Sequence, residues 1–457
     1  MTRRSYATVW LVSLLSLLPL QIGCSVDRLP VDEVDRQNPT DGPRSGDMSI
    51  PPPVCKGRFC DVPKCPSGTT TEVVGKLYAG NGKDPIPGAA VFVPVDNLPE
   101  FPPGLGCDLC NDTPPAVTQA ITNFDGSFRL KGTPAGKFPL VARLGRFQRV
   151  VAMESVACVE NTVPADPGTG TGTGIVRLPK KNRELSPQDY IPRIAVVSGD
   201  YDQIECVLKR IGIDELDMYN GRAVGSRNPP AIAELGALLA DETKLLSYNI
   251  VVVNCTDNQY QGLLATPQVK KNLEKFVRSG GRLYVTDWAY DVIEQVPEFA
   301  PYLCFEPQSL PGPAMCLAAP EKPTAADSRS YYGGQYRVLD KEMVKWLEQM
   351  PGVINRNAQV AVDYSFVVVS KASDDPKTQT KVWVDGPASS YGNRPQTVTF
   401  DYNSCGRVHF STYNTEPDGV VSESSRWPSS CKSNFSPQER LLEYLFFNIA
   451  SCVQGPG

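Results

Sequence analysis

The sequence predicts a multidomain chain in which an all-β unit is followed by an α/β unit with a doubly wound, mostly parallel sheet. Over residues 71–183, short strand-like runs alternate with glycine and proline turns. Over residues 184–457, strand-like runs alternate with helical periodicity, which favours a parallel sheet covered by helices on both faces. A glycine-threonine repeat at 168–174 cannot build an apolar core and is interpreted as a flexible loop or linker. Because residues 175–178 could add a last strand to the all-β unit, we place the boundary near Arg183 and not at the glycines.

Residues 1–24 have the pattern of a secretory signal. An arginine pair at 3–4 precedes an apolar run at 9–20 that is too short to span a membrane, and Cys24 follows closely. This pattern resembles the signal of bacterial lipoproteins, in which the cysteine is diacylated and becomes the first mature residue. The resemblance implies a palmitate-type lipid on Cys24 and, because Ser25 follows, sorting to the outer membrane. An ordinary cleaved signal peptide is the alternative.

Residues 25–70 are rich in proline, aspartate, glycine and arginine and show no sustained periodicity. This composition predicts a tether that holds the folded part of the chain away from the membrane surface. Cys55, Cys60 and Cys65 lie at the distal end of the tether, where we expect them to stiffen it.

The all-β unit is predicted from four strand-like runs, at 72–78, 89–93, 127–130 and 138–144. Three segments resemble the carboxypeptidase regulatory-like β-sandwich: Val74-Gly-Lys-Leu-Tyr, Pro87-Gly-Ala-Ala-Val-Phe-Val and Thr122-Asn-Phe-Asp-Gly-Ser-Phe-Arg-Leu. The resemblance implies a β-sandwich that acts as a non-catalytic spacer or adhesive module. An insertion at 94–116 departs from the compact family pattern, and either decoration or a contact loop would explain it.

The α/β unit is predicted from buried-type strands at 193–198, 248–254 and 282–286, with helices at 203–211 and 266–278 between them. Such alternation is typical of a flavodoxin-like, doubly wound sheet. A last helix is expected after Ser436, because Ser436-Pro-Gln-Glu439 reads as a capping box with proline at the first helical position.

The α/β unit is similar to the class I glutamine amidotransferase-like superfamily, and within it to trehalose-utilisation-type domains. The similarity is carried by the segments 248–254, 277–285 and 406–416 and by the last helix. Active relatives use a cysteine on a tight turn and a His-x-Glu pair. Here the turn reads Thr286-Asp287-Trp288, and the place of the pair reads Asn414-Thr415-Glu416. The resemblance therefore implies a degenerate, non-catalytic relative, a pseudoenzyme.

Polar and aromatic residues follow three of the predicted strands. Because parallel strands end at one edge of a sheet, the loops that carry these residues should converge there. Such side chains suit a sugar, or a hard cation such as calcium, and no other cofactor is expected. Helix capping by Asp200 and Asp287 is the alternative. The candidate ligand-binding residues are Asp200, Tyr201, Asn254, Asp257, Asp287, Trp288 and Asp291.

The chain has 14 cysteines, so 13 remain after Cys24, and in an oxidising compartment most should form disulfides. Cys107 and Cys110 have the CxxC spacing of a zinc site. Zinc is nevertheless the weaker alternative, because a second CxxC or a histidine pair is missing. Because the count is odd, one thiol should be unpaired or form an intermolecular disulfide. For Cys206 and Cys255, a disulfide with each other is the favoured pairing. The single histidine, His409, is expected to be a packed residue in a strand.

Composition and charge narrow the function. With 457 residues and a formal net charge of -5, the chain has no basic run interleaved with aromatics, so we expect no nucleic-acid partner. The expected function is a non-catalytic binding or assembly role at the cell surface. The membrane would be contacted through the lipid anchor, and an envelope protein or a carbohydrate would be the partner. The alternative is a hydrolase of carbohydrate or amide bonds that uses Asp200, Asp287 and Asp291, with or without a metal.

Overall fold

The computed structural model describes residues 55–101, 104–109, 114–165, 170, 172–221, 230–255, 264, 266–306, 332–415, 431 and 434–453. The segment Cys55–Gly457 makes up one compact unit of the chain. The predicted signal, the lipidation site Cys24 and most of the predicted tether lie outside the described residues. Every helix in the described part of the chain is too short or too polar to cross a bilayer.

The region after residue 71 folds into two four-stranded sheets. Alternate residues of these sheets, such as Val73 and Leu77 in one and Val91 and Leu140 in the other, join a single buried apolar cluster. All four strands predicted here are present, within two residues at either end. One sheet contains β1 (Glu72–Tyr78), β4 (Ser127–Lys131), β7 (Glu160–Thr162) and β8 (Ile175–Arg177), and the other contains β2 (Ala90–Pro94), β3 (Ala116–Ile121), β5 (Gly136–Leu144) and β6 (Phe147–Ser155).

The rest of the described chain is built on a nine-stranded sheet in the order β10-β9-β11-β12-β19-β18-β17-β14-β15. Its first five strands pair in parallel and the others pair antiparallel. The prediction of a mostly parallel sheet is therefore right for one half only, because hairpins extend the sheet beyond β19. The strands are β9 (Ile194–Ser198), β10 (Asp217–Asn220), β11 (Ile250–Val253), β12 (Arg282–Thr286), β14 (Tyr332–Val338), β15 (Gln359–Ser365), β17 (Lys381–Pro387), β18 (Asn393–Tyr402) and β19 (Gly406–Ser411).

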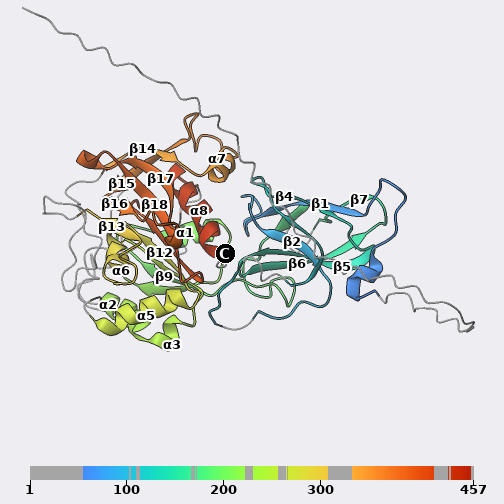
Figure 1. The fold of residues 1–457 in the computed structure, drawn as a ribbon, viewed down its shortest axis with the longest axis horizontal. Helices are drawn as coiled ribbons and strands as arrows, with labels where there is room; N and C mark the ends of the chain where they lie inside the picture. Colours follow the sequence, from blue (N-terminus) through green and yellow to red (C-terminus); the bar gives the residue numbers. More distant parts are fainter. Residues whose placement is uncertain are drawn as a thin grey trace, which may run out of the picture. The chain divides into compact units, whose positions relative to one another are not determined.

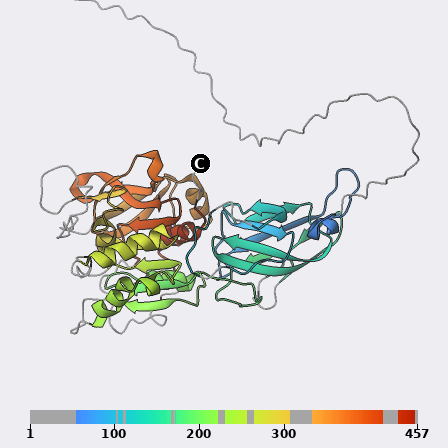
Figure 2. The same cartoon turned by 60° about the horizontal axis from the view of Figure 1, so that its bottom comes forward.

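Helices cover both faces of the parallel half (Figure 1 and Figure 2). Side chains alternate along β9: Ile194 and Val196 join one apolar cluster, whereas Ala195 and Val197 join another. The first cluster includes residues of α1 (Ile204–Arg210) and α8 (Pro437–Ala450), and the second includes residues of α2 (Pro230–Ala240), α3 (Glu242–Leu245) and α5 (Pro267–Arg278). The smaller elements are β13 (Leu303–Phe305) and β16 (Val369–Ala372), which pair with each other, α6 (Asp291–Glu294), α7 (Lys341–Leu347), η1 (Gly57–Asp61), η2 (Asp287–Tyr290), η3 (Pro376–Thr378) and η4 (Ser389–Tyr391).

The start of α8 confirms the predicted capping box. The Ser436 hydroxyl accepts from the backbone N–H of Glu439, and the Glu439 carboxylate accepts from the backbone N–H of Ser436. The same carboxylate forms an ion pair with Arg210 of α1, so the two helices on this face are tied together at one end.

Disulfides connect distant parts of the chain, as the cysteine count predicts. The described pairs are Cys55–Cys60, Cys65–Cys158, Cys107–Cys405 and Cys206–Cys431, and Cys304 and Cys452 are disulfide-bonded as well. The preferred Cys206–Cys255 pairing is wrong: α1 directs Cys206 to the chain just before α8, whereas Cys255 is a buried free thiol after β11. The residues described contain no group of three His, Cys, Asp or Glu side chains that could hold a metal ion.

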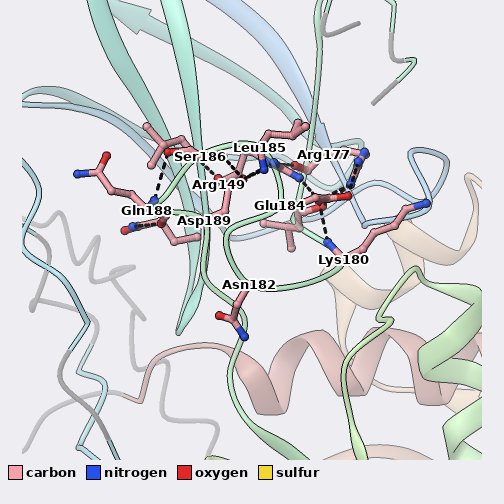
Figure 3. A network of polar contacts seen from close by, with 12 residues as sticks. Arg149, Arg177, Lys180, Asn182, Glu184, Leu185, Ser186, Gln188 and Asp189 are labelled. Atoms are coloured by element: carbon pink, nitrogen blue, oxygen red, sulfur yellow. Dashed lines mark hydrogen bonds and ion pairs between the residues drawn. The ribbon is translucent and has the colours of Figure 1, made fainter. Parts of the chain in front are cut away.

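A buried ion network holds the segment that includes the predicted boundary at Arg183 (Figure 3). Arg149 of β6 pairs with Asp189 at 2.6 Å and with Glu184 at 2.6 Å, and Arg177 of β8 pairs with Glu184 at 2.8 Å. The Asp189 carboxylate also accepts from the backbone N–H groups of residues 150, 185 and 186. This segment is therefore fixed to the small sheets by charge-assisted hydrogen bonds.

Candidate functional site

The carboxyl ends of the parallel strands meet at one edge of the sheet, and a buried carboxylate, Asp202, lies at the centre of their contacts. Its Oδ1 accepts from the backbone N–H of Gln203 at 2.8 Å and from the backbone N–H of Thr415 at 2.9 Å. The hydroxyls of Thr415 and Thr286 donate to the two carboxylate oxygens, each at 2.5 Å. Asp202 thereby joins the ends of β9, β12 and β19, and burial raises its pKa.

Asp287 is the residue that directly follows β12. Its φ of 38° lies in the left-handed region, which is strained for a non-glycine residue. The carboxyl is fully buried, and its Oδ1 accepts from the backbone N–H groups of Phe366 at 3.3 Å and Val367 at 3.0 Å. Burial raises the pKa of Asp287 well above its usual range and so favours the protonated form, and the carboxyl group binds the loop after β15.

The capping alternative is wrong for Asp287, which is the N-cap of neither η2 nor α6. Residue Gln203 is the N-cap of α1 and Thr286 is the N-cap of η2, and neither makes a side-chain capping bond. The carboxyl of Asp287 bonds to a different segment of the chain. Asp200 is fully buried beside this edge and has interaction partners of its own.

Replacing Asp287 by asparagine should stabilise the protein at neutral pH. In the parent the acid is protonated when folded but ionised when unfolded above about pH 4, so its contribution falls as the pH rises. Asparagine keeps the Oδ1 acceptor and does not ionise in the unfolded state, so its contribution to stability does not fall with rising pH. We expect the variant and the parent to be equally stable near pH 4, and the variant to gain about 1 kcal/mol or more by pH 7, as for other buried polar groups. Urea unfolding at both pH values measures the difference, and a variant that is less stable at pH 7 contradicts it.

Cys255 is the free thiol of the described residues, and its position makes it unreactive. The side chain is fully buried, with Sγ 3.9 Å from Oδ2 of Asp287. Burial and then the nearby acids Asp287 and Asp202 raise the pKa of this thiol well above its usual value. The thiolate, which is the nucleophilic form, is therefore disfavoured.

The other predicted residues are dispersed around this edge. The amide of Asn254 donates to Glu205 at 2.7 Å, and Trp288 is half-buried against the apolar cluster beneath α5. The backbone N–H of Tyr201 donates to the carbonyl of Cys255 at 3.3 Å. Asp291 is buried on α6, where burial and the neighbouring Glu294 raise its pKa to about 8.

Of the two residues predicted to stand in place of a His-x-Glu pair, Asn414 is described by the structure and Glu416 is not. Asn414 is buried, and its carbonyl accepts from the side-chain amide of Gln438 on α8 at 2.5 Å. Glu416 lies outside the described residues, as does the candidate ligand Asp257. Of the predicted ligand-binding residues, Asp287 and the backbone of Tyr201 contact Cys255. The acid that connects the strand ends is Asp202, which was not among the predicted residues.

His409 is a packed residue of β19, as expected. Its ring stacks on Tyr284 with the ring centroids 4.0 Å apart, and neither ring nitrogen has a hydrogen-bond partner in the described structure. Complete burial, with a smaller effect from Arg407, lowers the pKa of His409 to about 3. The imidazole is therefore neutral over the physiological range, and no described acid orients it as a catalytic base would require.

A large cleft lies elsewhere, and sequence reasoning did not predict it as a site. Its volume is about 1460 Å³, and the segment of the 94–116 insertion that reaches it contributes Phe101 and Asp108. Arg143 and Arg146 line it from the β5–β6 hairpin, and Asn448 lines it from α8. Of the two interpretations of the insertion, this position favours a contact loop. A second hollow of about 850 Å³ is lined by Phe101 as well, together with Tyr190 and Asp189.

No protein-family model matches the chain, and no curated protein sequence matches it. Solved structures that match include a ThuA-like protein from Bacteroides uniformis, with 11% identity, a TM-score of 0.30, and coverage of 57% of this chain and 94% of that one. A ThuA-like protein from Parabacteroides merdae has 12% identity, a TM-score of 0.31, and coverage of 58% and 92%. A β-galactosidase from Rahnella has 14% identity, a TM-score of 0.23, and coverage of 57% and 31%. At these values the likeness assigns neither a family nor an activity.

Proposed function

We propose that this chain is a lipid-anchored protein of the cell envelope with a non-catalytic role in binding or assembly. The observation that carries the proposal is the state of Asp287. At the position where the amidotransferase resemblance would place a nucleophile, this chain has a buried acid with a raised pKa, whose hydrogen bonds hold a neighbouring loop in place.

The other reactive groups at this edge support the same function. Cys255 is buried and protonated, His409 is buried and neutral, and Asp202 already accepts four hydrogen bonds from the protein. An acyl-transfer or hydrolytic mechanism needs a nucleophile or base that reaches the substrate. The described residues of this edge supply structural hydrogen bonds instead.

Export is supported by two features of the chain. The basic pair, the apolar run and Cys24 have the lipoprotein pattern, and the disulfides link segments far apart in the sequence, with Cys107 and Cys405 separated by 298 residues. Such disulfides persist in oxidising compartments. The residues between Cys24 and the folded unit would then form the tether to the membrane.

Metabolic labelling with a palmitate analogue tests the anchor. The parent chain should incorporate the label and fractionate with the outer membrane, whereas a Cys24→Ala variant should do neither. An unlabelled parent that is secreted in soluble form would indicate an ordinary signal peptide and would overturn the anchored part of the proposal.

A panel of glycoside and amide substrates tests the non-catalytic part. The parent should show no turnover above that of an Asp287→Asn, Asp291→Asn double variant. Turnover by the parent that the double variant loses would favour the hydrolase alternative. The double variant removes both buried acids while keeping their shape, so a loss of activity could be separated from unfolding by circular dichroism.

A further inference from the structure

The arginine Arg143 lies in the wall of the large cleft, where the charge of Asp108 acts on it without forming an ion pair. It lies on β5 opposite Gln148 of β6, and its Nε donates to Oε1 of Gln148 at 3.1 Å, with a second bond from Nη2 to the same oxygen. The amide nitrogen of Gln148 donates to the carbonyl of Gln188 at 2.9 Å, which fixes the orientation of the amide. The described structure contains no ion pair of Arg143.

Aromatic rings hold the guanidinium in place. Its central carbon lies 4.6 Å from the ring centroid of Phe101 and 5.7 Å from that of Phe92, and Phe101 in turn stacks on Tyr190. Cation–π contacts of this kind orient a guanidinium without neutralising its charge. Partial burial lowers the pKa of Arg143 to about 10, so it remains charged at neutral pH.

The other cations of the cleft are neutralised by the protein. Arg146 binds both carboxylate oxygens of Asp108 at 3.0 Å. Arg407 pairs with Asp401, and Lys345 pairs with Glu342 at 2.8 Å. Among the described cations of the cleft, Arg143 is therefore the one without an ion pair. Its Nε–Nη2 edge is bound to Gln148, and the remaining N–H groups of its two terminal nitrogens suit a carboxylate or a similar oxyanion.

The rest of the lining indicates what carries that anionic group. Two exposed acids, Asp96 and Glu100, also line the cleft, and they would repel a ligand with closely spaced negative charges. The volume of about 1460 Å³ exceeds the roughly 300–1,000 Å³ of a site for a drug-sized molecule. The rest of the lining combines apolar residues, such as Pro99, Phe124 and Phe447, with neutral hydrogen-bonding side chains, namely Asn97, Gln119, Asn123, Asn448 and Ser451.

We propose that this cleft binds an oligosaccharide that carries a single acidic group, with the acid bound by Arg143 and the sugar hydroxyls by the neutral amides. Such a ligand offers its anionic group to Arg143, its hydroxyls to the amides of the lining, and the apolar faces of its sugar rings to the prolines and aromatic rings of the wall. A polyanion would be repelled by the carboxylates of Asp96 and Glu100. This inference rests on the proposed binding role and names its ligand class.

An array of immobilised glycans, probed with the purified full chain, tests the inference. The array includes neutral oligosaccharides, the same oligosaccharides bearing one uronic or sialic acid, polyanionic glycans, and acidic peptides. We expect binding to the singly acidic members above their neutral parents. Binding confined to neutral, polyanionic or peptide members would overturn the inference, and so would no binding at all.

Two substitutions locate the binding. Arg143→Gln removes the charge but keeps a donor for Gln148, and it should weaken binding of the best singly acidic glycan by about tenfold to a hundredfold, as expected for a lost charge-assisted pair. Arg129→Gln is the control, because Arg129 is an exposed arginine on β4 that does not line the cleft. It should bind as the parent does. Equal affinity of the Arg143 variant and the parent would overturn the assignment of the site.

The outcome is separable from that of the proposed function. If Cys24 is labelled by palmitate, the substrate panel shows no turnover and no glycan binds, the anchored, non-catalytic role stands and the ligand class is wrong. Circular dichroism of both variants confirms that they fold, and an Arg143→Lys variant, which keeps the charge but not the fork, should have intermediate affinity.

Discussion

Replacing Arg149 by leucine should lower the free energy of unfolding by about 3–5 kcal/mol, the usual effect of breaking a buried ion pair. The Arg149 side chain is 1% exposed, and that of its partner Asp189 is fully buried (Figure 3). Without the guanidinium, Asp189 would be a buried carboxylate with no cation. Glu184 would keep one ion pair, with Arg177, and its hydrogen bond from the backbone N–H of Lys180. Urea denaturation followed by tryptophan fluorescence measures the loss.

Arg129→Leu is the matched control for this prediction. Arg129 also pairs with two acids, Glu72 and Glu160, but its side chain is 48% exposed. Exposed pairs contribute only about 0–1 kcal/mol because water and salt screen them. Similar losses in the two variants would show that burial does not determine the strength of the Arg149 network.

The same network makes the free energy of unfolding depend on pH. The two arginines and a backbone N–H outweigh burial and lower the pKa of Glu184 to about 2. A carboxylate whose folded pKa is lowered contributes its stability above the unfolded pKa of about 4.3 and loses it as the pH falls toward the folded value. The difference in stability between the parent and a Glu184→Gln variant should therefore shrink between about pH 4 and pH 2.

Replacing His409 by phenylalanine should make the protein less sensitive to acid. The folded pKa of about 3 lies below that of an unfolded histidine, so the unfolded state takes up the proton first. His409 thus contributes stability above about pH 6.5 that is lost as the pH falls toward 3. With an unfolded pKa of about 6.5, the loss between pH 7 and pH 5 is about 2 kcal/mol.

This effect has to be measured as a difference between variant and parent. Buried acids with raised pKa values, such as Asp287 and Asp291, change stability in the opposite direction over the same pH range. They are present in both proteins and cancel in the difference. The stability of His409→Phe relative to the parent should therefore rise by about 2 kcal/mol from pH 7 to pH 5. A difference that does not change with pH would mean that His409 is hydrated or hydrogen-bonded in the folded state.

The parallel half of the large sheet could be predicted because its strands are short apolar runs between amphipathic helices. β12 and α5 match their predicted ranges within one residue, and the capping box at Ser436 is present. The antiparallel half could not be predicted in the same way. β17 and β18 form a hairpin whose pairing contains two register shifts, so alternation along the sequence is interrupted.

The candidate site was predictable in position but not in detail. The loop at 200–202 is where the pattern places it, yet the pattern does not reveal that Asp202 is the acid that accepts from Thr286 and Thr415. Cys206 and Cys255 lie in adjacent strand-helix units, whereas the true partner of Cys206 is 225 residues away. The cleft has no local signature, because its lining comes from segments that only the folded chain brings together.

Native-state alkylation of Cys255 tests the central claim most directly, since the claim is that the strand-end cluster is a closed structural element. The full chain would be treated with a small maleimide at neutral pH, before and after unfolding in urea, and the labelled cysteine identified by peptide mapping. We expect Cys255 to remain unlabelled in the native protein and to be labelled completely once unfolded. Rapid labelling in the native protein would show an accessible, reactive thiol at this edge and would contradict a non-catalytic role.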